Sequence, residues 1–291
     1  MLTDEQKTFY ADNGYVLVKG LLTPQEAAAY RQESHDLIER LSARRDTEAT
    51  WGSAKSEAQQ TKIHLCHDVQ FQSAAFSRLI LDDRLTGAAA SLIGPNVQLH
   101  HTKLFIKPPE KGSPFPLHQD APFFMHENHS MIAAIIHFDD APLEKGCVCV
   151  VPGSHKRGML PHIPTGSWHL PPDEYPIESA VPLPAEAGDV LLFSYFTIHG
   201  SGINTSQEAR TTVLVQMRDP EDPPSNKGHL SQGQGMMLRG IDPTCQIRPA
   251  LERVQNTDGT ISDAQESSVS KNETPREMAG AGAMGGGMGR M

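Results

Sequence analysis

A change of pattern at Gly94-Pro95 constrains the fold of this chain more than any other sequence feature. Before it, apolar residues recur at helical spacing. After it, short runs of β-forming residues alternate with turn residues. The predicted helices cover residues 3–13, 24–41 and 73–93, and the predicted strands cover 15–18, 97–107, 131–138, 147–151, 189–193 and 211–217. Helices followed by strands predict a mostly β, α+β fold, an antiparallel sandwich or barrel with helices packed outside.

The ends of the first helices carry capping signals. Thr3 with Gln6 forms a capping-box pattern, and Gly14 suits the end of the helix that follows. Pro24 suits the first turn of the second helix. The polar residues 43–60 are expected to form a loop.

The last part of the chain lacks the residues of a packed core. No aromatic residue follows Phe196, and residues 278–291 consist of Met, Ala and Gly apart from Arg290. Such a segment cannot bury enough surface to offset the entropy lost on ordering. We therefore expect one domain over residues 1–254 and a disordered tail over 255–291.

The charge balance narrows the possible partners. Twenty-five basic against thirty-five acidic side chains give a formal charge of -10, which disfavours nucleic acid or an anionic membrane as the main partner. No apolar run reaches the roughly 20 residues of a membrane span, and the N-terminus does not resemble a secretory signal. The four cysteines form no disulfide pattern. We expect a soluble, cytoplasmic protein.

The segment Pro116-Leu117-His118-Gln119-Asp120 carries the sharpest chemical signal. Residues two apart in an extended segment point the same way, so His118 and Asp120 offer an imidazole and a carboxylate on one face. Iron(II) dioxygenases complete such a pair with a second histidine and leave three coordination positions open. His199, after the predicted strand 189–193, is the candidate third ligand.

Arg210 stands at the start of the apolar strand 211–217. A guanidinium aimed inward needs an anionic partner, and its planar fork suits a carboxylate. By itself Arg210 would be interpreted as part of a salt bridge at the strand edge. Most of the fourteen histidines are expected to have ordinary surface or hydrogen-bonding roles, and of His100 and His101, adjacent in a strand, only one should point inward.

Taken together, these motifs resemble the phytanoyl-CoA dioxygenase family of iron(II)- and 2-oxoglutarate-dependent oxygenases. The resemblance covers about residues 3–220, and the combined HxD…H…R set is what makes it specific. The matching stretches are 94–96, 101–109, 116–120, 146–147, 151–156 and 199–202. The resemblance implies a double-stranded β-helix, the cupin-like jelly roll, with helical support.

The resemblance also implies a role for each matching residue. It implies that His118, Asp120 and His199 hold Fe(II), and that Arg210 with Ser201 anchors the far carboxylate of 2-oxoglutarate. The implied reaction uses O2 to hydroxylate a C–H bond of a small organic substrate, while 2-oxoglutarate is decarboxylated to succinate.

Three further residues stand at positions where the family has cosubstrate contacts. Lys62 matches a basic contact and is equally well interpreted as a solvated lysine. Lys103 and Ile136 fall where the family's hydroxylase has methionine and tryptophan beside the cosubstrate, so both depart from its pattern.

Other functions fit the same residues. One is a non-catalytic jelly-roll protein whose HxD…H set holds zinc or nothing; Asp120 and Arg210 together favour the enzyme, because a binding module needs no cosubstrate anchor. Another is a desaturase, cyclase or epimerase of the same cofactor class, which the sequence does not separate from a hydroxylase. Asp120 disfavours halogenation, since halogenating relatives carry a small residue there. Residues 161–184, with Trp168 and Tyr175, are expected to form an irregular loop, either a substrate lid or a crossover without a special role.

Overall fold

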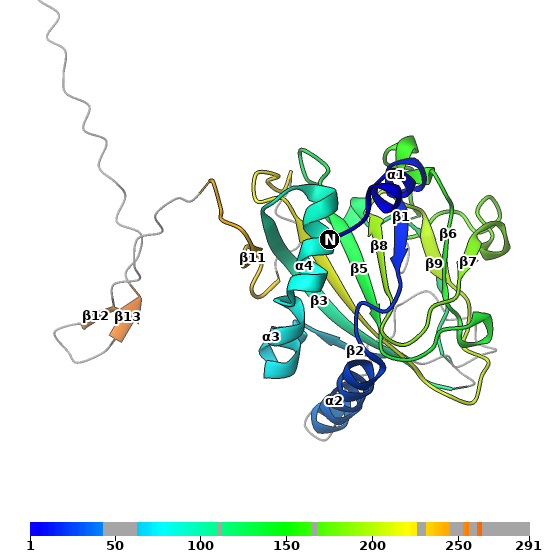
Figure 1. Cartoon of the computed structure of the whole chain (residues 1–291), viewed down its shortest axis with the longest axis horizontal. Coiled ribbons are helices and arrows are strands. Elements are labelled where there is room, and N and C mark those ends of the chain that lie inside the picture. The colour runs from blue at the N-terminus through cyan, green and yellow to red at the C-terminus, as the bar shows by residue number, and fades with distance from the viewer. Residues whose placement is uncertain are drawn as a thin grey trace, which may run out of the picture. The chain divides into compact units, whose positions relative to one another are not determined.

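The computed structural model describes residues 1–42, 63–109, 112–163, 168–225, 231–244, 253–255 and 261–263 (Figure 1). The chain divides into two compact units, Met1–Thr244 and Cys245–Met291. In the second unit, β12 (Arg253–Gln255) pairs with β13 (Ile261–Asp263) as an antiparallel hairpin. The boundary near residue 254 and the disorder of the tail stay predictions. No helix in the described part of the chain is both long and apolar enough to cross a membrane.

Local capping sets the ends of the first helix, as the sequence predicts. Thr3 and Gln6 exchange side-chain-to-backbone hydrogen bonds at the start of α1 (Asp4–Asn13). Gly14 follows this helix with a φ of 82°, a conformation that glycine adopts without steric cost. The second helix, α2 (Pro24–Ser42), begins with its proline in the first turn. The loop expected over 43–60 lies outside the described residues.

The single helix predicted over residues 73–93 is wrong. The structure has two helices there, α3 (Ala74–Ile80) and α4 (Asp83–Ile93). Asp82 separates them because its carboxylate accepts a hydrogen bond from the backbone N–H of Arg84 at 2.8 Å and so caps a new helix.

Two antiparallel sheets form the body of the first unit (Figure 1). The larger sheet has the order β1-β8-β5-β10-β3-β11, and β2 also pairs with β3. Its strands are β1 (Tyr15–Val18), β2 (His64–His67), β3 (Val97–Lys107), β5 (Ile132–His137), β8 (Val190–Ser194), β10 (Arg210–Arg218) and β11 (Met237–Arg239). The smaller sheet has the order β4-β9-β6-β7, and its strands are β4 (Phe115–His118), β9 (His199–Ser201), β6 (Val148–Val150) and β7 (Val181–Leu183). Every strand predicted from the sequence is present, whereas β2, β4, β7, β9 and β11 were not predicted.

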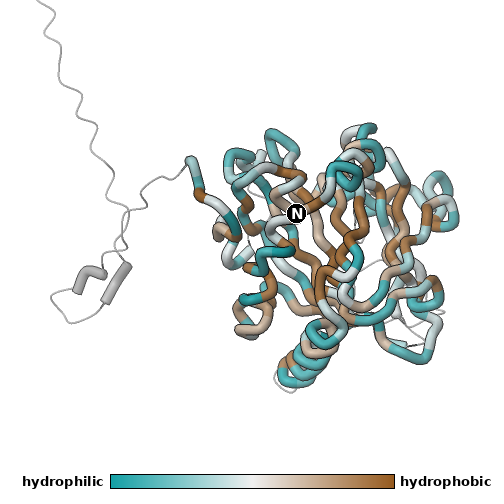
Figure 2. The backbone as a smooth tube through the Cα atoms, in the orientation of Figure 1, coloured by the Kyte–Doolittle hydropathy of each residue, from teal (hydrophilic) through white to brown (hydrophobic). Residues whose placement is uncertain are grey.

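The two sheets face each other across a shared apolar interior. Val148 and Val150 of the smaller sheet pack with Leu191, Phe193 and Leu214 of the larger one. Figure 2 shows that hydrophobic residues are concentrated along the strands and hydrophilic ones in the loops. Two antiparallel sheets packed in this way confirm the predicted jelly roll.

Alternation along β10 assigns its residues to two different surroundings. Val213, Val215 and Met217 belong to a core on the helical side of the larger sheet, together with residues of α2, α3 and α4. The residues between them point the opposite way, toward the smaller sheet. A line of side chains on one strand is thereby directed into the space between the sheets.

The segment 161–184 is more regular than the sequence predicts. Besides a bridge between Ile163 and His169, it contains the strand β7, which pairs with β6. Pro182 lies in the middle of β7, and this is tolerated because β7 is the edge strand of its sheet, where a missing N–H breaks no ladder.

Candidate active site

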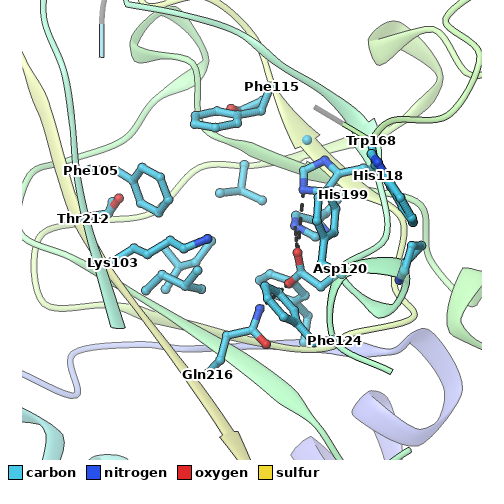
Figure 3. Close-up of a pocket in the computed structure, with 18 of the residues that line it drawn as sticks. Lys103, Phe105, Phe115, His118, Asp120, Phe124, Trp168, His199, Thr212 and Gln216 are labelled. Carbon is cyan, nitrogen blue, oxygen red and sulfur yellow. Dashed lines mark hydrogen bonds and ion pairs between the residues drawn. The ribbon is translucent and has the colours of Figure 1, made fainter. Parts of the chain in front are cut away.

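Two strands of the smaller sheet bring the predicted metal ligands together. His118 ends β4 and His199 begins β9, and the two residues are direct partners in the antiparallel ladder. Asp120 follows two residues after His118, and its Oδ1 lies 3.8 Å from Nε2 of each histidine (Figure 3). All three side chains are buried. Three residues predicted from the sequence therefore converge on one point.

Hydrogen bonds to the backbone fix which nitrogen of each imidazole faces that point. Nδ1 of His118 lies 2.8 Å from the carbonyl oxygen of Pro116, and Nδ1 of His199 lies 3.0 Å from that of Thr197. Because a carbonyl oxygen can only accept, Nδ1 carries the proton and Nε2 keeps its lone pair. Burial, assisted by the neighbouring His199, also holds the pKa of His118 well below its usual value. Both rings are thus prepared to act as neutral ligands.

Gln216 orients the carboxylate of Asp120. Its Nε2 donates to Oδ2 of Asp120 at 2.6 Å, and both side chains are buried. This bond leaves Oδ1 as the oxygen directed at the two imidazoles. Sequence reasoning missed Gln216, although its even spacing from Arg210 on one strand could have signalled that the two share a face.

The donor set fits a divalent first-row transition metal. Two neutral imidazole nitrogens and one carboxylate oxygen, all within 4.8 Å of one another, form the only such cluster found among the described residues. Two histidines and one carboxylate on one face, with room for further ligands, are typical of non-haem iron(II) oxygenases.

The three ligands open into a cavity of about 420 Å³ (Figure 3). Its walls are largely aromatic and aliphatic, and the aromatic residues are Phe105, Phe115, Phe123, Phe124, Trp168 and Phe193. Trp168, from the segment expected to be a loop, is 42% exposed and packs against Phe123 with 5.8 Å between the ring centroids. The other residue singled out in that segment, Tyr175, lines a separate cavity of about 780 Å³.

Arg210 lines the same cavity and is buried. One of its Nη atoms donates to the carbonyl oxygen of Gly146, and its Nε has no hydrogen-bond partner among the described residues. Burial lowers the pKa of this guanidinium to about 10. No carboxylate in the described part of the chain forms a salt bridge with it, so the salt bridge at the strand edge is not observed.

Gly146 holds its carbonyl against Arg210 in a conformation that requires glycine. Its φ is 64°, and a Cβ at this position would lie 2.5 Å from the carbonyl oxygen of Gly202. Close approach of these two backbone segments therefore supports the position of the arginine.

Ser201 also faces the cavity, two residues beyond His199 on β9. Its Oγ accepts a hydrogen bond from Nζ of Lys107 at 2.7 Å. Lys107 is fully buried, and burial next to Arg210 lowers the pKa of its ammonium well below the usual value. Sequence reasoning assigned Lys107 no role beyond its place in a matching motif.

The other three expected cosubstrate contacts differ in where the structure places them. Lys103 lines the cavity, with its Nζ 5.7 Å from the centroid of Phe124, and burial lowers its pKa while Asp120 raises it (Figure 3). Ile136 does not face the cavity: it belongs to the helix-side core, and Ile135 lines the cavity instead. A shift of one residue along a strand exchanges its two faces, which is why this placement was wrong. Lys62 lies outside the described residues.

His100 and His101 contradict the expectation that only one of them points inward. A β-bulge interrupts the register of β3 with β10 between Gln216 and Met217, so the strict alternation of side chains fails here. The Nδ1 atoms of the two histidines lie 2.6 Å apart, and both rings pack against Phe124 with centroids 5.0 and 4.9 Å away.

Comparison with known proteins gives consistent matches over this part of the chain. A family model described as phytanoyl-CoA dioxygenase (PhyH) matches residues 10–212. The peroxisomal phytanoyl-CoA dioxygenase of Rattus norvegicus is 31% identical over 234 residues, which cover 73% of this chain and 67% of the rat protein.

Two solved structures resemble the fold. The non-heme alpha ketoglutarate dependent carbocyclase SnoK from nogalamycin biosynthesis is 26% identical with a TM-score of 0.65, and the match covers 81% of this chain and 93% of SnoK. The epimerase SnoN, crystallised with Fe3+, alpha ketoglutarate and nogalamycin RO, is 27% identical with a TM-score of 0.62, and the match covers 82% of this chain and 96% of SnoN.

Proposed function

This chain belongs to the phytanoyl-CoA dioxygenase family, and we propose that within it the protein is an iron(II)- and 2-oxoglutarate-dependent dioxygenase that hydroxylates a C–H bond of a small organic substrate. One observation carries the proposal: the His118–Asp120–His199 cluster and the buried Arg210 open into the same apolar cavity. A protein that only stored a metal would have no use for a buried guanidinium facing that cavity.

Different residues of the site bind the metal and the cosubstrate. His118, Asp120 and His199 hold iron, while Arg210 and Ser201 hold the far carboxylate of 2-oxoglutarate. Bound iron(II) with 2-oxoglutarate supplies the chemistry, in which O2 hydroxylates the substrate and 2-oxoglutarate is converted to succinate and carbon dioxide.

The cavity walls provide the surroundings in which the substrate reacts. Aromatic side chains exclude water and orient the carbon that reacts. Lys103 lies among these walls and is retained as a proposed cosubstrate contact.

Three described cysteines, Cys66, Cys147 and Cys149, are free thiols, which supports a cytoplasmic location as part of the proposal.

The decisive experiment measures metal and cosubstrate binding directly. Under anaerobic conditions, protein with iron(II) and 2-oxoglutarate should develop a weak visible charge-transfer band, which air and a suitable substrate should bleach with release of succinate. Asp120→Ala should abolish iron binding and succinate formation while the metal-free protein keeps its melting temperature. Asp222→Ala is the matched control: it removes a buried carboxylate that accepts from Ser130 at 2.7 Å, so it should lower stability and leave the iron stoichiometry unchanged.

A second candidate function comes from the structural likeness to a carbocyclase and an epimerase. Such an enzyme would share the iron, the cosubstrate and succinate formation, so the product must decide. With 18O2, hydroxylation places labelled oxygen in the substrate-derived product, whereas cyclisation or epimerisation does not. Protein that binds zinc, but neither iron nor 2-oxoglutarate at millimolar concentrations, would instead be a non-catalytic binding module.

A further inference from the structure

Two cations lie side by side at the end of the cavity that Arg210 occupies. Lys107 and Arg210 are direct partners across β3 and β10, and both are buried. Within the described ranges, neither forms a salt bridge with a carboxylate. Two buried charges of the same sign repel each other, and each loses hydration, so an anion beside them would be bound favourably and would keep both groups in their charged forms.

Three contacts hold the ammonium of Lys107 in place. It donates to Oγ of Ser201 at 2.7 Å and to the carbonyl oxygen of Gly202 at 2.8 Å, and it lies 5.0 Å from the centroid of Phe115. These partners come from β9, the residue after it and β4, so the lysine ties the larger sheet to the smaller one beside the cavity. Lys107 does not itself line the cavity, whereas Ser201 does.

The chemistry of the two groups fixes the direction of the serine hydroxyl. In its ammonium form, which an anion beside it favours, Lys107 carries three donors and no acceptor, so Oγ of Ser201 can only accept in this bond. The hydroxyl hydrogen is then left to donate elsewhere. Ser201 lines both this cavity and the separate cavity beside Tyr175, and of the two only this one is also lined by Arg210, which would hold an acceptor close to the hydroxyl. Ser201 is thereby set as a donor beside Arg210, which suits a carboxylate and disfavours a ligand that offers only donors.

We propose that Lys107 is a positioning residue that makes the site selective for the far carboxylate of its oxo-acid cosubstrate, by holding the Ser201 hydroxyl as a donor into the cavity. This inference rests on the proposed function, since it concerns the same cosubstrate. It adds a residue that does not touch the cosubstrate and that acts through another side chain.

The test is a double-mutant cycle read out by binding. Wild type, Lys107→Met, Ser201→Ala and the double variant are loaded with iron(II) and titrated anaerobically, by calorimetry and by the charge-transfer band, with 2-oxoglutarate and with 2-oxobutanoate, which lacks the far carboxylate. Lys107→Met should weaken 2-oxoglutarate binding about tenfold or more and leave 2-oxobutanoate binding unchanged. In the Ser201→Ala background, Lys107→Met should add little, because the group through which it acts is absent.

Two further variants separate positioning from charge and from structural damage. Lys107→Gln keeps an N–H donor for Ser201 without the charge, so it should restore most of the affinity lost in Lys107→Met, and it also serves if the methionine variant does not fold. Lys145→Met is the matched control: it removes a buried lysine ammonium that pairs with Glu208 and does not line the cavity, so it should leave the affinities for both oxo acids unchanged.

Several results would overturn the inference. Additive losses in the double variant would mean that Lys107 acts by its own charge, and parallel losses for both oxo acids would mean that it serves the fold alone. Unchanged 2-oxoglutarate affinity in both Lys107 variants would remove its role altogether. If the wild type binds iron but no oxo acid, the proposed function fails, which is a separate outcome from failure of the Lys107 variants.

Discussion

Replacing Gln216 with leucine tests whether the metal site depends on its orienting hydrogen bond. In the structure the amide of Gln216 donates to Oδ2 of Asp120 at 2.6 Å, and both groups are buried. Leucine fills a similar volume but cannot donate. The carboxylate would then be free to rotate, and Oδ2 would be left without that donor in an apolar cavity.

The size of the effect follows from the charge on the acceptor. A buried hydrogen bond to an ionised group contributes about 1.5–3 kcal/mol, and about 1.4 kcal/mol corresponds to a tenfold change in an equilibrium constant. Gln216→Leu should therefore weaken iron(II) binding by roughly 10–150-fold, in line with the effect of losing other groups that orient metal ligands.

Competition with a chelator of known affinity measures this change, and the melting temperature of the metal-free protein checks the fold. Gln98→Leu is a suitable control, because Gln98 is a buried glutamine of β3 whose amide donates to Sδ of Met237 and which does not line the cavity. Gln216→Leu with the iron affinity of the wild type would show that another group orients Asp120, and an equal loss in both variants would mean general destabilisation.

Three other predictions address the cosubstrate anchor, the pH dependence and the domain boundary. Arg210→Lys keeps the charge and loses the fork, so the KM for 2-oxoglutarate should rise at least tenfold in succinate assays; an unchanged KM would move the anchor elsewhere. Burial lowers the pKa of His137 to about 4, so the unfolded chain takes up this proton before the folded protein does. Stability from this group is complete above about pH 6.5 and falls by roughly 3 kcal/mol as the pH drops to 4; denaturant titrations should show a shallower decline for His137→Leu, and identical pH profiles would contradict this. Truncation after Thr244, where the first compact unit ends, should leave the melting temperature unchanged, and a large decrease would mean that later residues stabilise the core.

Features that depend on neighbouring residues could be predicted from the sequence. The helix cap at Thr3 and the shared direction of His118 and Asp120 follow from the local geometry of the backbone. The five strands after residue 94 were likewise visible as apolar runs between turns. The position of His199 beside His118 was predicted only through the combination of motifs, because no local rule relates residues in different strands.

Features that depend on strand register could not be predicted. Gln216 contacts Asp120, and Lys107 contacts Ser201, only because separate strands align at those positions. The choice between Ile135 and Ile136 requires the register of β5 to the residue. His100 and His101 share one side because of a bulge, and no pattern of apolar residues encodes where an extra residue enters a strand.

Because His118 pairs with His199 in the strand ladder, a metal bound to both side chains would also cross-link two distant parts of the chain. One ion bound to both rings would join points about 80 residues apart in the chain and so close a long loop. An unfolded chain cannot hold the ion in this way, so metal at 100 times its dissociation constant adds about 2.7 kcal/mol to the stability of the folded state. The strands that would loosen first without it are those of the smaller sheet, each only three or four residues long. In a cell short of iron, proteolysis would therefore remove this protein faster. Its abundance, as well as its catalytic rate, would follow the iron supply.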